Sequence, residues 1–439
     1  MPTQWSPTPA QSAAMTLTGR DILVSAAAGS GKTATLTERI IRLLTEVHPD
    51  GTHAGDISRM LIVTFTRAAA AELRARLSAA LSAAIAAHPE DRYLYRQLVA
   101  LGNAHICTID AFYLEPVRAH FEQLGLPSAF RLADEYELTP LKEQTLRRLI
   151  ADAYDRAAVA SAPAGQPLDA LRDNRFAEAL DNLMPNRDRG ELPSILLSLY
   201  EKLLTYPAGV ELLRTASERL RKEAEIPLAE SEMGQALMHD ITERLSALGS
   251  AMSRACGKLQ EHPVLCERYL PAFAQDLDTL RRLCGSLEAG DLAGAREILN
   301  TYKPASLKAI PRGTELPADT EHHKQTRAAV KETLAALRDC TLFGDEDAVH
   351  ASMRRTADTE RILYDLLTAY DAAIGEEKLR RGMLDFSDIR RCMYRLLVDR
   401  DGNVTDIART LADSFDAVYI DEYQDVDAVQ DAIFAILGA

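Results

Sequence analysis

The sequence predicts an α/β fold in which helices cover a parallel sheet and a long helical segment is inserted into the same domain. Apolar strand-like runs alternate with helix-like segments in the first 112 residues, an order typical of parallel sheets. The middle of the chain is mostly helical, and a strand-like run returns only at Phe415. We therefore expect 1–112 and 381–439 to form one α/β domain and 113–380 to form an inserted, mainly helical subdomain.

Four short apolar runs are the expected strands, because such runs bounded by turn residues are typical of buried parallel strands. These strands are Asp21–Ser25, Met60–Phe65, His105–Ile109 and Phe415–Ile420, and the expected helices include Thr33–Val47, Arg67–Ala87 and Asp427–Leu437. Within the insertion, five apolar residues recur at the spacing of one helix face and should pack inward. They are Ile362, Leu366, Leu367, Tyr370 and Ile374.

The composition is that of a globular protein from a reducing compartment. Hydrophobic residues make up 47% and charged residues 26% of the 439, enough for two or three domains with a sizeable core. No apolar run reaches the roughly 18 residues that span a membrane, and no signal peptide is recognisable, so we expect a cytoplasmic protein. The six cysteines are scattered and form no CxxC pair, which argues against a disulfide scaffold or a zinc site.

The net charge of −15 opposes nucleic-acid binding as a global property, yet one segment is basic. Between Arg59 and Arg76 there are four arginines, at 59, 67, 74 and 76, against the single acid Glu72. A local positive track of this kind is what contact with phosphates requires. Two loops are also expected, Ser161–Pro167 and the proline-containing Lys303–Pro317. The basic residues of the second loop are better explained by solvation than by contact with duplex DNA.

A phosphate-binding loop is expected between the first strand and the helix that follows it. Its sequence is Ala26-Ala27-Ala28-Gly29-Ser30-Gly31-Lys32-Thr33, with Ala26 where the general pattern has glycine. The glycines allow backbone N–H groups to close around phosphates, and the helix N-terminus favours negative charge. Lys32 would neutralise the β- and γ-phosphates of ATP, and the Thr33 hydroxyl would bind Mg²⁺. The alternative, a chance turn before a helix, explains fewer of these features.

Two carboxylates directly follow the last predicted strand. Asp421, at the end of the strand, suits a Mg²⁺ ligand, usually through water, and Glu422 suits a general base that orients the attacking water. An acidic turn in an acidic protein is the alternative. The pairing with a phosphate loop favours the catalytic interpretation, with both elements at one strand-end edge of the sheet, where ligands bind in open α/β folds.

The order of these blocks resembles the UvrD/Rep branch of superfamily 1 helicases, and more closely the AddA-type subunits of the AddAB helicase–nucleases. The matching segments are Trp5–Gln11, Ile22–Thr33, Leu61–Leu73, His105–Phe112, Leu384–Ile389 and Val418–Asp425. The resemblance implies a RecA-like P-loop NTPase sheet, with Gln11 as the adenine contact and Gln424 coupling the γ-phosphate to DNA. It also implies ATP and Mg²⁺ as cofactors.

The same resemblance implies DNA contacts at two places. The first comprises Thr64, Phe65, Thr66 and Arg67, where hydroxyls, helix N–H groups and an arginine can hold a phosphate and an aromatic ring can stack on a base. The second comprises His105, Thr108 and Phe112, although Asp110-Ala111-Phe112 stands where the family often has His-Ser-Phe. Taken without the family, threonine caps, core phenylalanines and a structural histidine explain these residues better than DNA contact does.

The function implied for the full-length protein is ATP-driven 3′→5′ translocation on single-stranded DNA, unwinding duplex ends for double-strand break repair together with a nuclease partner of the AddB type. One alternative is a stand-alone UvrD/Rep-type repair helicase. Others are an ATP- and DNA-binding module without turnover, and a DNA-binding scaffold that needs no nucleotide. The family's second motor domain and nuclease do not follow before Ala439, so we expect a fragment or a truncated gene product that binds nucleotide weakly and turns over little ATP.

Overall fold

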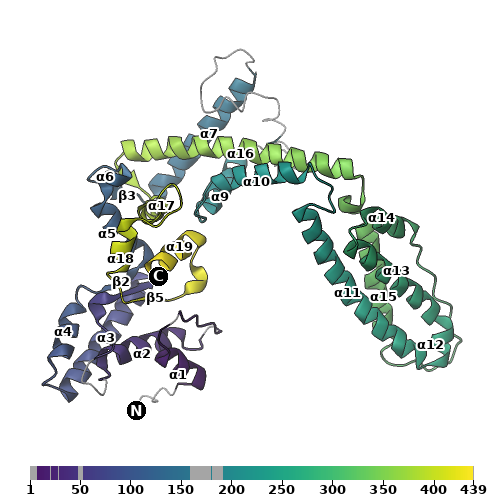
Figure 1. The fold of residues 1–439 in the computed structure, drawn as a ribbon, viewed down its shortest axis with the longest axis horizontal. Coiled ribbons are helices and arrows are strands. Elements are labelled where there is room, and N and C mark those ends of the chain that lie inside the picture. The colour runs from purple at the N-terminus through teal and green to yellow at the C-terminus, as the bar shows by residue number, and fades with distance from the viewer. Residues whose placement is uncertain are drawn as a thin grey trace. The chain divides into compact units, whose positions relative to one another are not determined.

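The computed structural model describes residues 7–19, 21–27, 29–47, 53–158, 179 and 191–438. The predicted loop Ser161–Pro167 lies outside these residues. The chain divides into two compact units (Figure 1). Unit 1 comprises Met1–Ala153, Asn186–Val210 and Leu367–Ala439, and unit 2 comprises Tyr154–Pro185 and Glu211–Leu366. Each unit has its own hydrophobic core.

Unit 1 is built on a three-stranded parallel sheet. Its strands are β1 (Met60–Thr64), β2 (His105–Thr108) and β5 (Ala417–Ile420), in the order β2-β1-β5. All five residues of the central strand are buried, whereas the outer strands are mostly half-buried. In the register, Thr64 lies beside Thr108 and Val63 lies beside Ile420. The carboxyl ends of all three strands therefore meet at one edge of the sheet.

Successive residues of β1 point to opposite faces of the sheet, and all five are buried. Helices therefore cover both faces. One face, with Ile62, is covered by α2 (Lys32–Thr45), α3 (Arg67–Ala87) and α4 (Arg92–Ala100). The other face, with Leu61 and Val63, is covered by α5 (Ile109–Ala119), α17 (Phe386–Leu397) and α19 (Ala428–Leu437). Burying each such aliphatic side chain contributes about 1.5–3 kcal/mol, so the sheet is held chiefly by these two cores.

The remaining elements of unit 1 are shorter or lie beside this sheet. They are α1 (Pro9–Thr16), η1 (Ile57–Arg59), α6 (Phe121–Leu124), α7 (Glu135–Ala158, up to Ala153), α9 (Leu192–Leu203), α18 (Asp406–Ala412) and η4 (Tyr423–Asp425). A second parallel pair joins β3 (Arg131–Leu132) to β4 (Met383–Leu384). Asp385 and Asp388 follow β4. The buried ammonium of Lys378, which precedes the strand, donates to these two carboxylates at 2.7 Å and 2.8 Å. The segment Leu384–Ile389 is thus a helix cap fixed by a buried ion pair.

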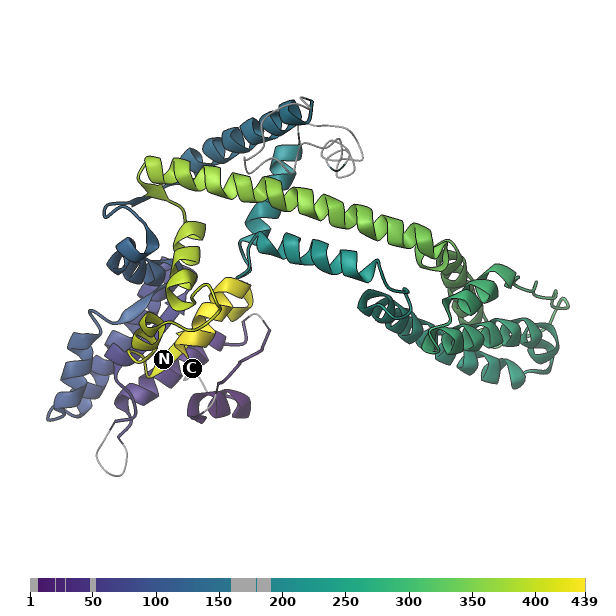
Figure 2. The ribbon, with the colours of Figure 1, turned by 45° about the horizontal axis from the view of Figure 1, so that its top comes forward.

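Unit 2 is a helical bundle (green in Figure 2). Its helices are α10 (Glu211–Glu223), α11 (Glu232–Gln260), α12 (Pro263–Arg268), α13 (Leu270–Glu288), α14 (Leu292–Thr301), α15 (Thr320–Arg338), η3 (Thr341–Phe343) and α16 (Glu346–Arg380) up to Leu366. Leucines, Met252 and Phe273 form its core. The Tyr364 hydroxyl donates to Glu211 at 2.7 Å, so the segments that enter and leave the bundle lie side by side.

A buried ion pair crosses the bundle core of unit 2. The Arg327 guanidinium donates to Asp276 at 2.5 Å, and the Tyr302 hydroxyl donates to the same carboxylate at 2.9 Å. Arg327 also donates to the Ala305 carbonyl at 2.6 Å. Because Ala305 belongs to the irregular segment between α14 and α15, this network anchors that segment to the bundle.

Most predicted elements are present, and one strand is wrong. The structure confirms a mainly helical chain with a small parallel sheet, the irregular segment Lys303–Pro317, and the burial of all five residues predicted to pack inward from α16. Residues 21–27 form irregular chain, not the predicted strand Asp21–Ser25. Leu23 is 77% exposed and Val24 is 44% exposed, because no strand of the described sheet pairs with them. None of the helices in the described part of the chain is long and apolar enough to cross a membrane.

Candidate nucleotide site

The predicted phosphate loop ends at the N-terminus of α2 in a conformation that only glycine adopts readily. Gly31, the residue before the helix, has φ +85°, and Gly29 has φ +76°. A Cβ at Gly31 would also lie 3.3 Å from the Gln11 amide nitrogen. No side chain within the described residues caps this helix end and its first turn holds no acid, so its N–H groups can bind an anion. Ala28 lies outside the described residues.

Lys32 folds back over its own loop. Its ammonium donates to the carbonyl oxygens of Ala26 at 2.9 Å and Ala27 at 3.3 Å. Exposed carbonyls are neutral acceptors, and a phosphate would be a stronger, charged one. The ammonium therefore lies within the loop and can exchange these carbonyls for an anion.

Gln11 ties α1 to the phosphate loop. Its side-chain oxygen accepts from the Thr8 N–H at 2.8 Å, which completes the capping box of α1, and its amide donates to the Ser30 carbonyl at 2.9 Å. The amide predicted to read adenine thus lies against the loop in this structure. The preceding Trp5 and Ser6 lie outside the described residues.

Thr33 and Asp421 join the two predicted nucleotide elements. The Thr33 hydroxyl donates to the Asp421 carboxylate, at 3.1 Å from one oxygen and 3.3 Å from the other, across 388 positions of sequence. The sheet explains this contact, because β5 pairs with β1 and the Asp421 N–H continues the ladder to the Val63 carbonyl at 3.0 Å. As predicted, the structure brings both elements to the carboxyl edge of the sheet.

The same pair of side chains fits a magnesium ion. Neighbouring ligands of an octahedral Mg²⁺ with bonds of about 2.1 Å lie about 3.0 Å apart, close to the observed separation of the hydroxyl and carboxylate oxygens. Both are hard oxygen donors, which Mg²⁺ prefers. No group of three or more His, Cys, Asp or Glu residues in the described part of the chain could hold a metal by itself. Phosphate and water oxygens would have to supply the other ligands.

Glu422 adopts a strained backbone conformation. Its φ of +56° is the only positive φ of a non-glycine residue within the described ranges. Such a conformation costs about 1–3 kcal/mol and occurs mainly at functional sites. The Gln424 amide donates to the exposed Glu422 carboxylate, and the Asp421 carboxylate accepts from the Glu422 N–H at 3.1 Å. The expected base and the expected coupling residue are therefore in direct contact.

Four of the predicted DNA contacts lie at or next to the carboxyl edge of the sheet. Thr66 begins α3 and accepts from the Ala69 N–H at 3.1 Å, and Thr108 begins α5 and accepts from the Ala111 N–H at 3.3 Å. Both hydroxyls therefore still have a proton to donate to a phosphate. Phe65 is 37% exposed, and Arg67 is exposed without a hydrogen-bond or ion-pair partner among the described residues.

The other three predicted DNA contacts do not present a free side chain at the carboxyl edge of the sheet. His105 begins β2, at the opposite edge of the sheet, and its ring lies edge-on to Phe415 at 5.3 Å between centroids. Phe112 is buried in the core beneath α5, so it cannot stack on a base in this structure. Thr64 is buried, and its hydroxyl donates to the Thr66 carbonyl at 3.0 Å.

Three of the four arginines of the predicted basic track have partners in the fold, so the track stays a prediction. Arg59 pairs with Asp416, and Arg76 pairs with Glu72. Arg74 donates to four backbone carbonyls, those of Leu101, Gly102, Ala104 and Ile106. Arg67 is the member of the track that remains available to a ligand.

The sequence interpretation missed a polar cluster between α5, α17 and the start of α19. Asp427 caps α19 and pairs with Arg390 of α17. Burial raises the pKa of Asp110 above its ordinary value; Arg390 opposes this shift and Asp427 adds to it. The Tyr113 hydroxyl is buried there without a partner among the described residues. Asp427 and Gln430, spaced as a capping box, were the one signal in the sequence that could have located this cluster.

Comparison with known proteins relates this chain to helicases. Residues 7–439 match the family described as the UvrD/REP helicase N-terminal domain. The chain is 31% identical over 442 residues to a protein from Ruminiclostridium cellulolyticum and 34% identical over 445 residues to one from Moorella thermoacetica, each named as a subunit of an ATP-dependent helicase/nuclease. These alignments cover 99% and 98% of this chain but 34% and 30% of the two relatives. The chain thus spans about a third of the length of the curated relatives it matches.

Proposed function

Because this chain belongs to the UvrD/REP helicase N-terminal domain family, we propose that it forms the first part of an ATP-driven DNA helicase motor. The single observation that carries this proposal is the hydrogen bond between Thr33 and Asp421, which unites a phosphate loop and an acidic pair in one site. The RecA-like character of the sheet, and the division into a motor domain (1–112 and 381–439) with an inserted subdomain (113–380), belong to the same proposal.

In this proposal each side chain of the site has a role in ATP hydrolysis. Lys32 leaves the carbonyls of its loop and binds the β- and γ-phosphates, together with the N–H groups of α2. Thr33 and Asp421 would hold Mg²⁺, which supplies positive charge to the phosphates. Glu422, once released by Gln424, accepts a proton from the attacking water. Gln11, whose amide donates to the Ser30 carbonyl of the loop, would contact the adenine base.

The DNA side of the proposed motor is the carboxyl edge of the sheet. Thr66, Thr108 and Arg67 offer donors for phosphates, and Phe65 offers a ring on which a base can stack. Single-stranded DNA is the ligand that suits such a mixture. Because the two relatives are named as parts of an ATP-dependent helicase/nuclease, we further propose 3′→5′ translocation at double-strand breaks in a cytoplasmic complex with a nuclease partner of the AddB type.

Binding of ATP by the 439-residue chain tests the site directly. We expect Lys32→Ala to weaken the binding of ATP with Mg²⁺, measured by calorimetry, by about tenfold or more, because a charge-assisted contact to phosphate is lost. The matched control is Lys222→Ala, which removes an exposed lysine from unit 2. Equal affinity of both variants for ATP would contradict the proposal.

A second candidate function is nucleotide binding without turnover. It is favoured by the contact in which the Gln424 amide occupies the Glu422 carboxylate. In that case this chain binds ATP but releases little phosphate, even with single-stranded DNA present. Robust DNA-stimulated phosphate release that Glu422→Gln abolishes would eliminate this candidate and support the motor.

A further inference from the structure

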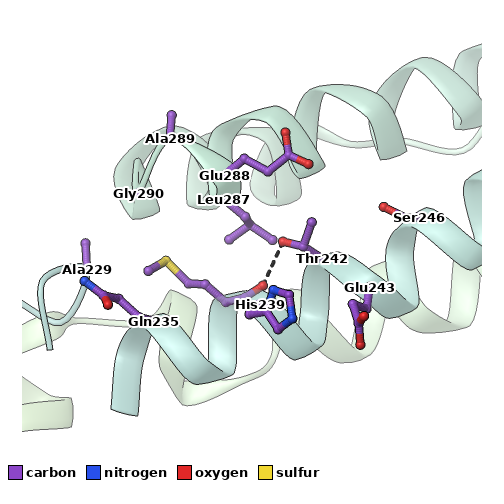
Figure 3. A pocket seen from close by; sticks show the side chains of 11 residues that line it. Ala229, Gln235, His239, Thr242, Glu243, Ser246, Leu287, Glu288, Ala289 and Gly290 are labelled. Atoms are coloured by element: carbon purple, nitrogen blue, oxygen red, sulfur yellow. Dashed lines mark hydrogen bonds between the residues drawn. The ribbon is translucent and has the colours of Figure 1, made fainter. Parts of the chain in front are cut away.

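A groove on unit 2, which we call the α11–α13 groove, has no role in the proposed motor. One wall is a stripe of α11, and the other is the C-terminal end of α13 with the turn that follows (Figure 3). Its volume is about 780 Å³, within the range of sites that take a ligand or several side chains. The groove lies wholly within unit 2 and so depends on one bundle.

The floor of the groove is apolar and its rim is acidic. Met238 and Leu287, both buried, and Ala229 form the apolar part. Glu243 on α11 and Glu288 on α13 stand on opposite walls, as Figure 3 shows, and neither has an ion-pair partner among the described residues. No lysine or arginine from the described part of the chain lines the groove.

An apolar floor with an acidic rim suits a ligand that carries both apolar and basic groups. Two carboxylates without an ion-pair partner among the described residues repel a phosphate backbone, so the rim disfavours DNA. An arginine or lysine side chain fits both features, because its aliphatic stem can lie on an apolar floor while its head reaches a carboxylate. We propose that the α11–α13 groove is a docking site for a partner protein, which inserts a segment of alternating basic and apolar side chains.

The polar side chains between the two glutamates complete the site. The Thr242 hydroxyl is used internally, since it donates to the Met238 carbonyl at 2.7 Å. The exposed Gln235 amide donates to the Glu230 carbonyl only at a long distance of 3.4 Å, and its side-chain oxygen can still accept. His239 is exposed on the same stripe of α11. Gln235 and His239 thus offer hydrogen bonds to the backbone of the inserted segment, whereas the glutamates set its charge.

Binding of a short fluorescein-labelled peptide that alternates arginine and leucine tests this docking site by fluorescence anisotropy. We expect the double variant Glu243→Gln/Glu288→Gln to bind at least about fivefold more weakly than the unaltered chain, because two rim charges are lost. The matched control is Glu315→Gln/Glu332→Gln, which removes two exposed carboxylates of unit 2 outside the groove, neither with an ion-pair partner among the described residues.

The control separates docking from general attraction to an acidic protein. Both double variants carry the same net charge, so a loss confined to the groove variant supports the site. Equal losses in both variants, or no binding by the unaltered chain, overturn the proposal. A peptide with serine in place of leucine keeps the charge and loses the apolar contact. Undiminished binding of that peptide contradicts the role of the apolar floor.

Discussion

The polar residues of the candidate nucleotide site in unit 1 and those of the bundle core in unit 2 are used in opposite ways. In unit 1, Lys32, Asp421 and Glu422 bond to groups inside the same site, at or near the surface, and each of these partners can be exchanged for a ligand. In unit 2, Asp276 and Arg327 are buried in the core and satisfied by each other, by a tyrosine and by a backbone carbonyl. The first arrangement is suited to binding and the second to holding a bundle together.

The largest expected effect breaks the buried pair of unit 2. Arg327→Ala leaves the Asp276 carboxylate buried without its cation, and we expect unfolding of unit 2 to become easier by about 3–5 kcal/mol. Urea denaturation followed by circular dichroism measures this change. The exposed pair Arg338–Asp339 is the control, since Arg338→Ala should cost less than about 1 kcal/mol. Equal effects at both sites would mean that burial does not distinguish the core pair of unit 2 from a surface pair.

The next effect tests whether the unit 1 contacts are exchangeable. Asp421→Ala should leave the fold intact but reduce the Mg²⁺-dependent part of ATP affinity by about tenfold or more, because a metal ligand is lost. Calorimetry with and without Mg²⁺ separates the two contributions. Asp425→Ala, which removes a nearby exposed carboxylate, should change neither. A loss of ATP affinity that is the same with and without Mg²⁺ would argue against the metal role of Asp421.

A smaller effect concerns the strain at Glu422. Glycine adopts positive φ without penalty, so Glu422→Gly should stabilise unit 1 by up to about 1 kcal/mol while removing the proposed base. Glu422→Gln keeps the strained backbone and should leave the thermal midpoint unchanged. If both variants unfold at the same temperature, no usable strain is stored at this position.

The smallest expected effect depends on pH. Burial raises the pKa of Asp110, with Arg390 opposing and Asp427 adding to the shift, so the folded state favours the protonated carboxyl. The contribution of Asp110 to stability is then fully present below the ordinary aspartate pKa of 3.8 and is lost as pH rises through the higher folded pKa. Asp110→Asn should therefore raise stability at pH 7 and have little effect at pH 3. Thermal unfolding at both pH values measures this, and an equal gain at both would contradict it.

Local patterns in the sequence predict the candidate nucleotide site, whereas the features that the sequence does not reveal depend on contacts between residues far apart in the chain. Two features can be recognised from a few neighbouring residues. Gly31 occupies a backbone conformation that requires glycine, and the residues of β1 are all apolar or small because the strand is buried on both faces. The partner of Arg59 is Asp416, which no local pattern reveals. The segment Asp21–Ser25 has the composition of a strand, but composition does not say whether a neighbouring strand is present.

The pairing of β1 with β5 also determines when during synthesis the sheet can be completed. At about 5–20 residues per second, a ribosome needs on the order of tens of seconds to synthesise the 388 positions between Thr33 and Asp421. During that time one edge of β1 lacks its partner strand and is open to wrong pairing. The bundle of unit 2 closes on itself where Tyr364 meets Glu211, so folding it first shortens the loop that β5 must close. Cotranslational folding of the insertion would thus lower the entropic cost of pairing β5 with β1 once β5 has been made.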